Sequence, residues 1–310
     1  MEKLLIAGGS GFIGRNLAES ACKENLEVTI LTKTGKVDKD FLNDIEILKV
    51  DLLDQVNLKK SLKGKKFDFV VNLSGYIDHS NFFSGGHKVL KVHFLGLINL
   101  LTCLEKERLK SFVNIGSSDE YGNQIAPQVE TMRESAISPY SAAKIASTHL
   151  LQNLYKTESF PSIILRLFLV YGVGQKKDRF IPQVIEGCLS RSPFKASEGK
   201  QLRDFTYVDD ISRGILLALR NKKVLGEVLN LASGEARSIR SMISLIEDKI
   251  GYGNPKFGTL PYRQAENMEL FANSKKAKKQ LNWEPQITLE EGLDLVIEDH
   301  LEKKIEKSKS

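Results

Sequence analysis

Tyr140 and Lys144 are the two side chains in this sequence best suited to move a proton. They are four positions apart, so on a helix both lie on one face. A nearby ammonium group favours the phenolate and so lowers the tyrosine pKa from its ordinary value of about 10. Such a tyrosine takes a proton from a hydroxyl group while a hydride leaves the same carbon. The spacing alone also fits a surface pair, because tyrosine and lysine are both frequent here.

A cluster of polar side chains follows the apolar segment SFVNIG, which we expect to be a buried strand. Ser117, Ser118 and Asp119 come directly after this segment. Ligands bind at the carboxyl ends of sheet strands in α/β proteins. We therefore predict that these three residues share a site with Tyr140. Asp119 and the glutamate after it also suit a turn or a helix cap, so their carboxylates do not by themselves indicate catalysis.

The N-terminal region contains a glycine turn of the kind that binds phosphate groups. Residues 3–7 form a short apolar run, and residues 8–14 follow with the pattern GxxGxxG. The first glycine permits a tight turn, the second lets the backbone approach a pyrophosphate, and the third allows a helix to pack closely on the strand. Backbone N–H groups at the start of that helix then face the phosphates. The predicted cofactor-binding residues of the turn are Gly8, Gly11, Phe12, Ile13 and Gly14.

The end of the second predicted strand bears on the choice between NAD and NADP. A carboxylate at this place hydrogen-bonds the ribose 2′-hydroxyl of NAD. This sequence has Thr32 and Lys33 instead, and a lysine suits the 2′-phosphate of NADP. The cofactor is therefore predicted to be NAD(P), with NADP favoured. Asp51 and Leu52, which end the following strand, are predicted to flank the adenine, although Asp51 also suits a helix N-cap.

Alternating strands and helices position these residues. Apolar runs predict buried strands, and apolar residues at helical spacing predict helices. Because crossovers between parallel strands are right-handed, this alternation predicts an α/β fold with a doubly wound parallel sheet of the Rossmann type. The predicted strands are residues 3–7, 27–32, 45–50, 67–73, 111–116, 161–169 and 229–232, and the predicted helices are 12–24, 54–62, 87–108, 138–158, 238–250 and 289–300.

The sequence changes in character near residue 170, where glycine and proline mark irregular chain. This change predicts a smaller second lobe, assembled from separate segments, that binds the substrate. We expect residues 1–170 and 205–235 to form the dinucleotide-binding domain. We expect residues 171–204 and 236–300 to form the second lobe, and residues 301–310 to be a charged tail.

The composition argues against several classes of protein. The 310 residues include 45 lysines and arginines against 39 acidic residues, a net charge of +6. The lysines of 275–279 and the tail hold this excess, and no aromatic residue lies among 275–279, so no nucleic-acid partner is expected. No apolar run is long enough to cross a membrane, and no signal peptide is recognisable. Three cysteines without metal-ligand spacing predict a reducing cytoplasm and no metal site.

The order of the glycine turn, the serine cluster and the Tyr140–Lys144 pair resembles the extended short-chain dehydrogenase/reductase family. The sequence is most similar to the branch that acts on nucleotide sugars, which contains 4-epimerases, 4,6-dehydratases and 4-keto-sugar reductases. The resemblance covers about residues 1–300. Its further motifs are Asn72-Leu73-Ser74-Gly75, Tyr121-Gly122 with Pro127 and Glu130, RLFLVYGVGQ at 166–175, QLRDFTYVDD at 201–210, and Asn282-Trp283-Glu284-Pro285 followed by Leu289-Glu290-Glu291-Gly292.

This resemblance implies roles for single residues. Tyr140 would be the acid/base, and Lys144 would activate it and bond the nicotinamide ribose. Ser117 would be the catalytic serine, with its neighbour as the fallback. An arginine suits the substrate diphosphate because its planar fork matches phosphate oxygens, although it also suits a surface salt bridge. The implied binding residues are Leu73, Ser74 and Gly75 beside the cofactor, and His79, Ser118, Arg203 and Arg263 beside the substrate.

Two positions depart from the family pattern. The family often has an asparagine in the helix before the serine strand, where it helps to hold a chain of catalytic water molecules, and here that position is His93. A histidine at this position forms similar hydrogen bonds or changes its charge with pH. The alternative is a buried histidine that serves only packing. The family asparagine that contacts the substrate is replaced by Leu169, in a stretch that we expect to lie in the core.

The enzymes of this branch all begin with hydride exchange at a sugar carbon, usually carbon 4, with the proton passing through Tyr140. The NADP preference favours net oxidoreduction at carbon 4 of a nucleotide-linked hexose or deoxyhexose, by a 4-keto-sugar reductase or sugar 4-dehydrogenase. A 4-epimerase and a 4,6-dehydratase that uses Asp119 are close alternatives. A dinucleotide-binding sensor without catalysis is the alternative from another class. The family resemblance also implies a homodimer through the helices near 90–108 and 138–156.

Overall fold

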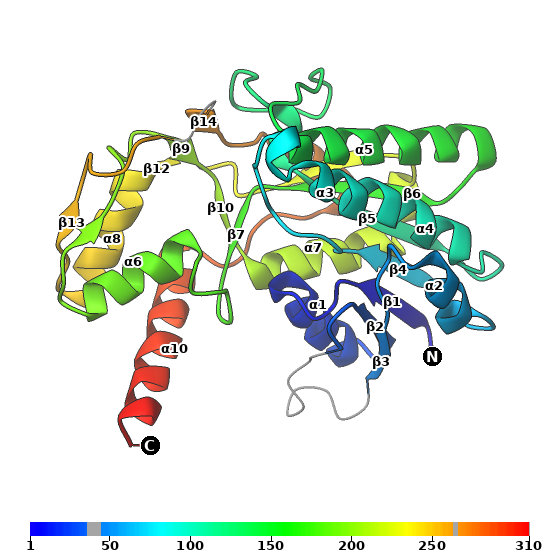
Figure 1. Ribbon diagram of the computed structural model, residues 1–310, viewed down its shortest axis with the longest axis horizontal. Coiled ribbons are helices and arrows are strands. Elements are labelled where there is room, and N and C mark those ends of the chain that lie inside the picture. Colours follow the sequence, from blue (N-terminus) through cyan, green and yellow to red (C-terminus); the bar gives the residue numbers. More distant parts are fainter. Residues whose placement is uncertain (36–44, 263–265, 310) are drawn as a thin grey trace.

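A seven-stranded parallel sheet forms the centre of the protein, as Figure 1 shows for the computed structural model, which describes residues 1–35, 45–262 and 266–309. The strand order is β11-β6-β5-β4-β1-β2-β3. The order reverses between β1 and β4, the kind of place where such sheets bind ligands. The strands are β1 (Lys3–Ala7), β2 (Glu27–Thr32), β3 (Glu46–Lys49), β4 (Phe69–Asn72), β5 (Ser111–Ser117), β6 (Ser162–Leu167) and β11 (Val228–Leu231).

The predicted doubly wound sheet is confirmed, and one predicted strand proves to be two. Within residues 161–169, β6 stays in the central sheet, whereas β7 (Leu169–Tyr171) pairs with β10 (Phe205–Tyr207). The N–H of Leu169 donates to the carbonyl of Asp204 over 3.0 Å, which directs the chain into this second pair. The side chain of Leu169 is 37% exposed, so the expectation that it lies in the core is wrong.

Helices cover both faces of the sheet because successive side chains of a strand point to opposite faces. In β1, Leu4 and Ile6 pack with α1 and α7, whereas Leu5 and Ala7 pack with α2, α4 and α5. The long helix α5 carries the predicted tyrosine and lysine, so its packing fixes their height above the sheet. The bounds of these helices are α1 (Phe12–Lys23), α2 (Gln55–Leu62), α4 (Gly96–Cys103), α5 (Pro139–Glu158) and α7 (Val208–Arg220).

The helix predicted over 87–108 is interrupted. It consists of α3 (His87–Leu90), a π-helical turn over Lys91–Leu95, and α4, which ends at Cys103. Single π-helical turns are frequent at functional sites because they redirect side chains. His93 lies in this turn and is buried.

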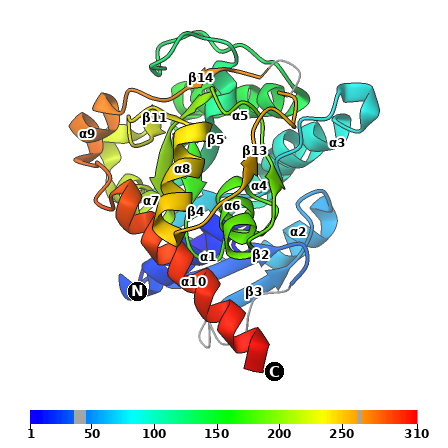
Figure 2. The ribbon, with the colours of Figure 1, turned by 90° about the vertical axis from the view of Figure 1, so that its left-hand side faces the viewer.

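A second hydrophobic cluster lies apart from the sheet, where α6, α8 and α10 pack together, and Figure 2 views it from its own side. Helices α6, α7 and α9 are not among those predicted. The boundaries of the two predicted domains stay a prediction. The remaining elements are α6 (Phe180–Leu189), α8 (Ile239–Ile250), α9 (Lys275–Leu281), α10 (Leu289–Lys309) and the short strands β8 (Phe194–Lys195), β9 (Leu202–Arg203), β12 (Arg237–Ser238), β13 (Pro255–Lys256) and β14 (Glu269–Leu270).

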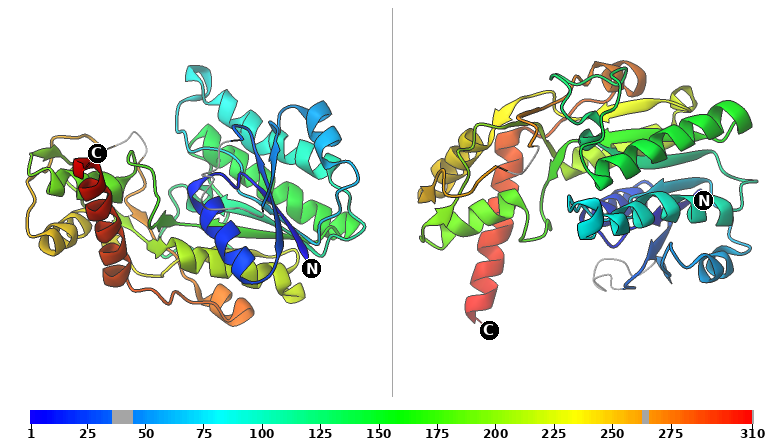
Figure 3. Two further views of the ribbon diagram at one scale, coloured as in Figure 1. Left: turned by 90° about the horizontal axis from the view of Figure 1, so that it is seen from below. Right: turned by 45° about the horizontal axis from the view of Figure 1, so that its top comes forward.

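The segment expected to be a charged tail continues α10 as a helix that projects from the rest of the molecule (Figure 3). Lys303 forms an ion pair of 2.7 Å with Asp299, one turn earlier, and Lys304 donates to the last carbonyl of α6 over 2.9 Å. These contacts explain why the helix extends beyond residue 300. None of the helices in the described part of the chain is both long and apolar enough to cross a membrane.

Candidate active site

The glycine turn between β1 and α1 has no room for side chains. A Cβ on Gly8, whose φ is +80°, would lie 2.8 Å from the backbone that follows β4, and a Cβ on Gly14 would lie 2.6 Å from the backbone of the turn itself. Gly11 begins α1 without a side-chain cap. The first N–H groups of the helix, including those of Phe12 and Ile13, are therefore available to an anion. The turn fits the pyrophosphate for which it is predicted.

β2 and β3 bring the residues predicted at the adenosine end together. Thr32 Oγ1 lies 2.7 Å from the hydroxyl of Ser10, a residue of the glycine turn that the sequence argument did not assign. Lys33 Nζ forms an ion pair of 2.8 Å with Asp51 Oδ2. The hydrogen bond to Asp51 raises the pKa of Lys33 above its usual value. Burial alone would raise the pKa of Asp51, but Lys33 holds it below its usual value. This end of the site therefore presents a carboxylate as well as an ammonium group.

Asp51, in the tight turn after β3, is not the N-cap of α2, although its position in the sequence also suits that role. The N-cap of α2 is Asp54, whose side chain accepts from the N–H of Asn57 over 3.1 Å. Asp51 instead accepts from the N–H of Leu53 over 3.0 Å and turns its other oxygen to the lysine. Leu52 is buried, and its carbonyl accepts a hydrogen bond of 2.8 Å from α4.

β4 ends directly beside the glycine turn. The N–H of Leu73 donates to the last carbonyl of β1 over 2.8 Å. Ser74 bonds through its hydroxyl to Asn72, whose amide donates to Asn114 Oδ1 over 2.8 Å. Gly75 has a φ of +123°, a conformation that other residues rarely adopt. Asn72 was not assigned a role from the sequence, where it is the first residue of the family motif at 72–75 and a polar residue at the end of an apolar strand.

Tyr140 and Lys144 lie near the start of α5, which Ser138 caps. Tyr140 is 5% exposed, and Ser117, which ends β5, lies close enough to lower the pKa of its phenol. Lys144 Nζ donates to the carbonyl of Ile115 over 2.6 Å and lies 5.8 Å from the centre of the Tyr140 ring. The fold therefore brings the predicted serine, tyrosine and lysine together where β5 passes under α5.

The protein alone does not favour the phenolate of Tyr140. Burial raises the pKa of Tyr140 well above its usual value, and the charge of Asp119 raises it further, although a hydrogen bond with Ser117 lowers it. Burial lowers the pKa of Lys144 to about 8, against the opposite effect of Glu120 and Asp119. In the protein without a cofactor, desolvation of the phenolate therefore dominates the pKa of Tyr140. The predicted lowering of this pKa, which involves the charge of the nicotinamide as well as that of Lys144, stays a prediction.

A buried cluster of charged and polar side chains supports the turn that begins at Ser117, which we call the serine turn. The N–H of Ser117 donates to one carboxylate oxygen of Glu120 over 2.9 Å. The other oxygen accepts from the hydroxyl of Thr148 over 2.8 Å and from Nε of Arg166 over 2.9 Å. Arg166 also pairs with Glu134 at 2.6 Å. Glu120 is fully buried, so it anchors and caps the turn and does not face a substrate.

His79 and Asp119 lie beside Tyr140 and are partly exposed. His79 Nδ1 is 3.7 Å from Asp119 Oδ2, and the two side chains are 36% and 24% exposed. The His79 ring meets the Tyr140 ring edge-on, with 5.7 Å between their centres. One residue follows β4 and the other follows the neighbouring β5, so the sheet order brings them together. Ser118, predicted to face the sugar, is buried between Ser117 and Asp119.

His93 fills the space between Tyr140 and the turn after β4. Its ring meets the Tyr140 ring edge-on at 5.1 Å, and its Nε2 lies 2.8 Å from the carbonyl of Tyr76, to which the neutral ring donates. Burial and the charge of Lys144 lower the pKa of His93 to about 3, so it is neutral at physiological pH. A Cβ on Gly75 would lie 2.1 Å from this ring. His93 and Gly75 therefore occupy one space.

Arg203 lies in β9, which pairs with β12 and β14 in a small three-stranded sheet. Its guanidinium pairs with Glu266. The adjacent Asp204 is buried and accepts from the N–H of Ser233 over 2.7 Å, which fixes the loop after β11. Burial raises the pKa of Asp204 above its usual value. Arg263 lies outside the described residues.

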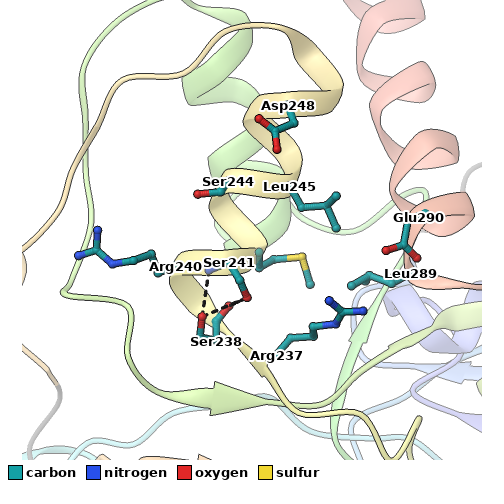
Figure 4. A pocket seen from close by; sticks show the side chains of 10 residues that line it. Arg237, Ser238, Arg240, Ser241, Ser244, Leu245, Asp248, Leu289 and Glu290 are labelled. Carbon is teal, nitrogen blue, oxygen red and sulfur yellow. Dashed lines mark hydrogen bonds between the residues drawn. The ribbon is translucent and has the colours of Figure 1, made fainter.

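A hollow in the second cluster is distinct from this site. It lies over the first turns of α8, between Arg237 and Asp248, and against Glu290 at the start of α10 (Figure 4). None of the predicted site residues lines it. In the part of the chain that the structure describes, no group of three or more histidine, cysteine or acidic residues is arranged to hold a metal ion.

Known proteins similar to this chain act on nucleotide sugars. The model of the NAD dependent epimerase/dehydratase family matches residues 4–232. UDP-glucuronate 4-epimerase of Thermodesulfobacterium geofontis is 30% identical over 308 residues, which cover 94% of each chain. dTDP-D-glucose 4,6-dehydratase of Dictyostelium discoideum is 29% identical over 257 residues, 75% of this chain and 58% of its own. The structure of UDP-glucuronic acid 4-epimerase from Bacillus cereus, in complex with UDP-glucuronic acid and NAD, has a TM-score of 0.87 at 26% identity and covers 97% of this chain and 99% of its own.

Proposed function

The chain belongs to the NAD dependent epimerase/dehydratase family, in the nucleotide-sugar branch of the extended short-chain dehydrogenases/reductases, and on this basis we propose that it is a 4-epimerase of a nucleotide-linked hexose or deoxyhexose. The relatives described above are 4-epimerases and a dehydratase, which supports this reading better than the net oxidoreduction that the sequence favoured. One observation carries the proposal: Ser117 and Lys144 both lie beside Tyr140, where Ser117 lowers the pKa of the phenol and Lys144 Nζ is 5.8 Å from the centre of the ring.

In the proposed reaction Tyr140 takes the proton of the carbon-4 hydroxyl, and Ser117 hydrogen-bonds the same oxygen. Lys144, held by the carbonyl of Ile115, keeps a positive charge near the phenol while the proton moves. Bound NAD supplies a hydride acceptor and, when oxidised, a further positive charge. Because the protein alone raises the pKa of Tyr140, we propose that this proton transfer needs the bound cofactor. NAD would also supply hydride to the opposite face of the 4-keto sugar, and Tyr140 would return the proton to the carbon-4 oxygen.

We propose NAD as the cofactor, held at its pyrophosphate by the glycine turn. The sequence favoured NADP through Lys33, but Asp51 is paired with this lysine. This carboxylate offsets the charge of the lysine and repels a 2′-phosphate, which supports NAD. The proposed cofactor-binding residues are Gly8, Gly11, Phe12, Ile13, Gly14, Thr32, Lys33, Asp51, Leu52, Leu73, Ser74, Gly75, Tyr140 and Lys144.

We propose that Arg203 binds the diphosphate of the substrate after exchanging its contact with Glu266 for phosphate oxygens. Arg263 is proposed as the second diphosphate ligand on the family resemblance alone. His79 and Ser118 are proposed to face the sugar. The complex of the Bacillus cereus epimerase with UDP-glucuronic acid supports a nucleotide sugar as the substrate class.

A 4,6-dehydratase is the second candidate, and Asp119 is the observation that favours it. This carboxylate lies close enough to raise the pKa of Tyr140 and pairs with His79. Dehydration needs an acid or base besides Tyr140, because a proton must leave carbon 5 and water must leave carbon 6. The similarity to the Dictyostelium dehydratase supports this candidate.

We propose a homodimer formed through α4 and α5, in the cytoplasm, with neither a membrane nor a nucleic acid as partner. The lysines of α9 support the last point because they form local ion pairs. Lys276 pairs with Glu227 at 2.7 Å, and Lys278 pairs with Glu284. Such pairs reduce the charge available to a phosphate backbone.

Incubation of the purified protein with UDP-glucose, UDP-glucuronate and dTDP-glucose, with products identified by mass and NMR, tests the proposed function. We expect unchanged mass with inverted carbon 4. Tyr140→Phe should lower turnover by about a hundredfold or more, since general acid–base catalysis contributes at least that much. Tyr252→Phe, at an exposed tyrosine after α8, is the matched control and should retain turnover.

Four results would contradict the proposal. Loss of water would identify the dehydratase instead. A change of two hydrogens in the product would restore net oxidoreduction. Cofactor binding without conversion of any sugar nucleotide would indicate a sensor, and full turnover by Tyr140→Phe would exclude the mechanism.

A further inference from the structure

Tyr76 lies between the glycine turn and the acid/base. It follows the turn after β4, which packs closely on Gly8, because a Cβ there would lie 2.8 Å from the backbone of this turn. On its other side, the carbonyl of Tyr76 accepts a hydrogen bond of 2.8 Å from Nε2 of His93, whose ring packs on Tyr140. We propose that the ring of Tyr76 contacts the bound cofactor, and that His93 is a positioning residue that links this contact to the placement of Tyr140.

The ring of Tyr76 is placed to meet a dinucleotide. β1 lies between β2 and β4 in the sheet, so the residues that follow β2 and β4 stand on either side of the glycine turn. Tyr76 follows β4, and Lys33 follows β2. The hydrogen bond to Asp51 is the main cause of the raised pKa of Lys33, and Tyr76 is close enough to add a small further rise. The side chain of Tyr76 is 44% exposed, so a ligand that lies along the glycine turn can cover its ring.

One rigid ring makes both contacts of His93. Its Nε2–H donates to the carbonyl of residue 76, and its plane meets that of the Tyr140 ring at 81°, with 5.1 Å between the ring centres. The ring is buried, and the absence of a side chain at Gly75 lets it lie directly against the turn after β4. Because a close-packed ring transmits displacement, a movement of the turn reaches the tyrosine. A shorter side chain without a ring, such as asparagine, would not make the contact with Tyr140.

The inference rests on the proposed function, because it concerns the cofactor and the acid/base of that reaction. When a bound dinucleotide covers the ring of Tyr76, residue 76 has fewer positions available, and His93 limits those of Tyr140 as well. A tyrosine held at a productive distance from the sugar hydroxyl transfers its proton more often. The coupling acts in both directions, so loss of the hydrogen bond from His93 should also weaken binding of the cofactor.

Titration calorimetry with NAD tests the contact of Tyr76. Tyr76→Ala should weaken binding of NAD about tenfold, because it removes an aromatic ring from the binding surface. Tyr76→Phe keeps the ring and should bind NAD as the wild type does. Tyr252→Ala removes an exposed tyrosine after α8 and is the matched control, which should also leave the affinity unchanged.

A double-mutant cycle tests the link between Tyr76 and His93. His93→Phe keeps a ring against Tyr140 but removes the donor to residue 76, so it should weaken binding of NAD about threefold to tenfold. In the background of Tyr76→Ala it should cause no further loss, because the side chain that it helps to place is missing. His87→Phe changes a histidine whose ring lies 3.3 Å from the carbonyl of Phe82, and this matched control should not alter the affinity.

Steady-state kinetics test the effect of His93 on Tyr140. His93→Asn removes the ring contact, and at saturating NAD it should lower kcat about tenfold, because a displaced acid/base meets the sugar hydroxyl less often. KM should change little, since the lost interaction acts in the transition state. The substrate is whichever of UDP-glucose, UDP-glucuronate and dTDP-glucose the wild type converts fastest. Thermal unfolding identifies any variant that fails to fold, and the variants of the exposed Tyr76 test the contact in that case.

The outcomes distinguish failure of this inference from failure of the proposed function. Wild-type affinity in Tyr76→Ala would overturn the cofactor contact and leave the epimerase intact. Additive effects in the cycle, or a raised KM with unchanged kcat in His93→Asn, would overturn the positioning role. Binding of NAD that depends on Tyr76, without conversion of any sugar nucleotide, would refute the epimerase but support the contact. A wild type that binds no NAD would refute the proposed cofactor and the inference together.

Discussion

At the scale of single residues, His93 and Gly75 show how one substitution depends on another. The ring of His93 packs on Tyr140 and donates to the carbonyl of Tyr76, so it ties the catalytic tyrosine to the turn after β4. The space that it occupies is the space that a Cβ at residue 75 would need. The absence of a side chain at residue 75 is therefore explained by the histidine found where the family often has asparagine.

Gly75→Ala should destabilise the protein by about 2–4 kcal/mol, because it adds both an overlap with the imidazole and a side chain at positive φ. In the background of His93→Asn the same change should cost less, by at least about 1 kcal/mol, because the overlap is removed. Urea unfolding of the wild type, both single variants and the double variant measures this coupling. Additive costs would show that the two residues do not share one space.

At the scale of elements, the ends of β2 and β3 decide which cofactor fits. Lys33 follows β2, and Asp51 follows β3, so the pairing of these parallel strands brings opposite charges together. A lysine that appears free in the sequence is paired in the fold. The choice between NAD and NADP therefore depends on the carboxylate of Asp51 as much as on the ammonium group of Lys33.

We expect the wild type to bind NAD at least about tenfold more tightly than NADP, since a charge of like sign beside a 2′-phosphate costs about 1.4 kcal/mol or more. Asp51→Asn should shift this preference towards NADP. Lys60→Met, an exposed lysine in the last turn of α2, is the control and should leave the preference unchanged. Titration calorimetry gives the affinities. Tighter binding of NADP by the wild type would restore the interpretation based on Lys33 alone.

At the scale of the whole molecule, exposed apolar residues near α4 and α5 suit the proposed dimer. Leu95, in the π-helical turn before α4, is 43% exposed, and Tyr155 on α5 is 38% exposed. A closed two-fold interface would bury such residues against their copies. The projecting helix α10 offers a comparison, because its Leu295 is also 43% exposed.

Light scattering should give twice the chain mass of 34.7 kDa for the wild type. Leu95→Arg should shift the protein towards the monomer, because it places a charge in the proposed apolar interface. Leu295→Arg changes an equally exposed leucine away from that interface and should leave the mass unchanged. A monomeric wild type, or equal effects of the two variants, would exclude the proposed interface.

The sequence by itself determined the features that depend on neighbours along the chain. The strands and the glycine turn are visible in local patterns, because side-chain alternation and tight turns are local properties. The spacing that places Tyr140 and Lys144 on one helix face is also a local property of the sequence. The alternation of strands and helices along the chain was also enough to predict the doubly wound sheet.

The tertiary structure alone decided which distant side chains meet. The order of the strands places His79 against Asp119 and pairs Lys33 with Asp51. The packing of the π-helical turn sets His93 against Tyr140 and raises the tyrosine pKa through burial. These outcomes could not be predicted because the electrostatic environment of a group depends on its distance from charges elsewhere in the chain and on its burial. Only the folded chain sets both quantities.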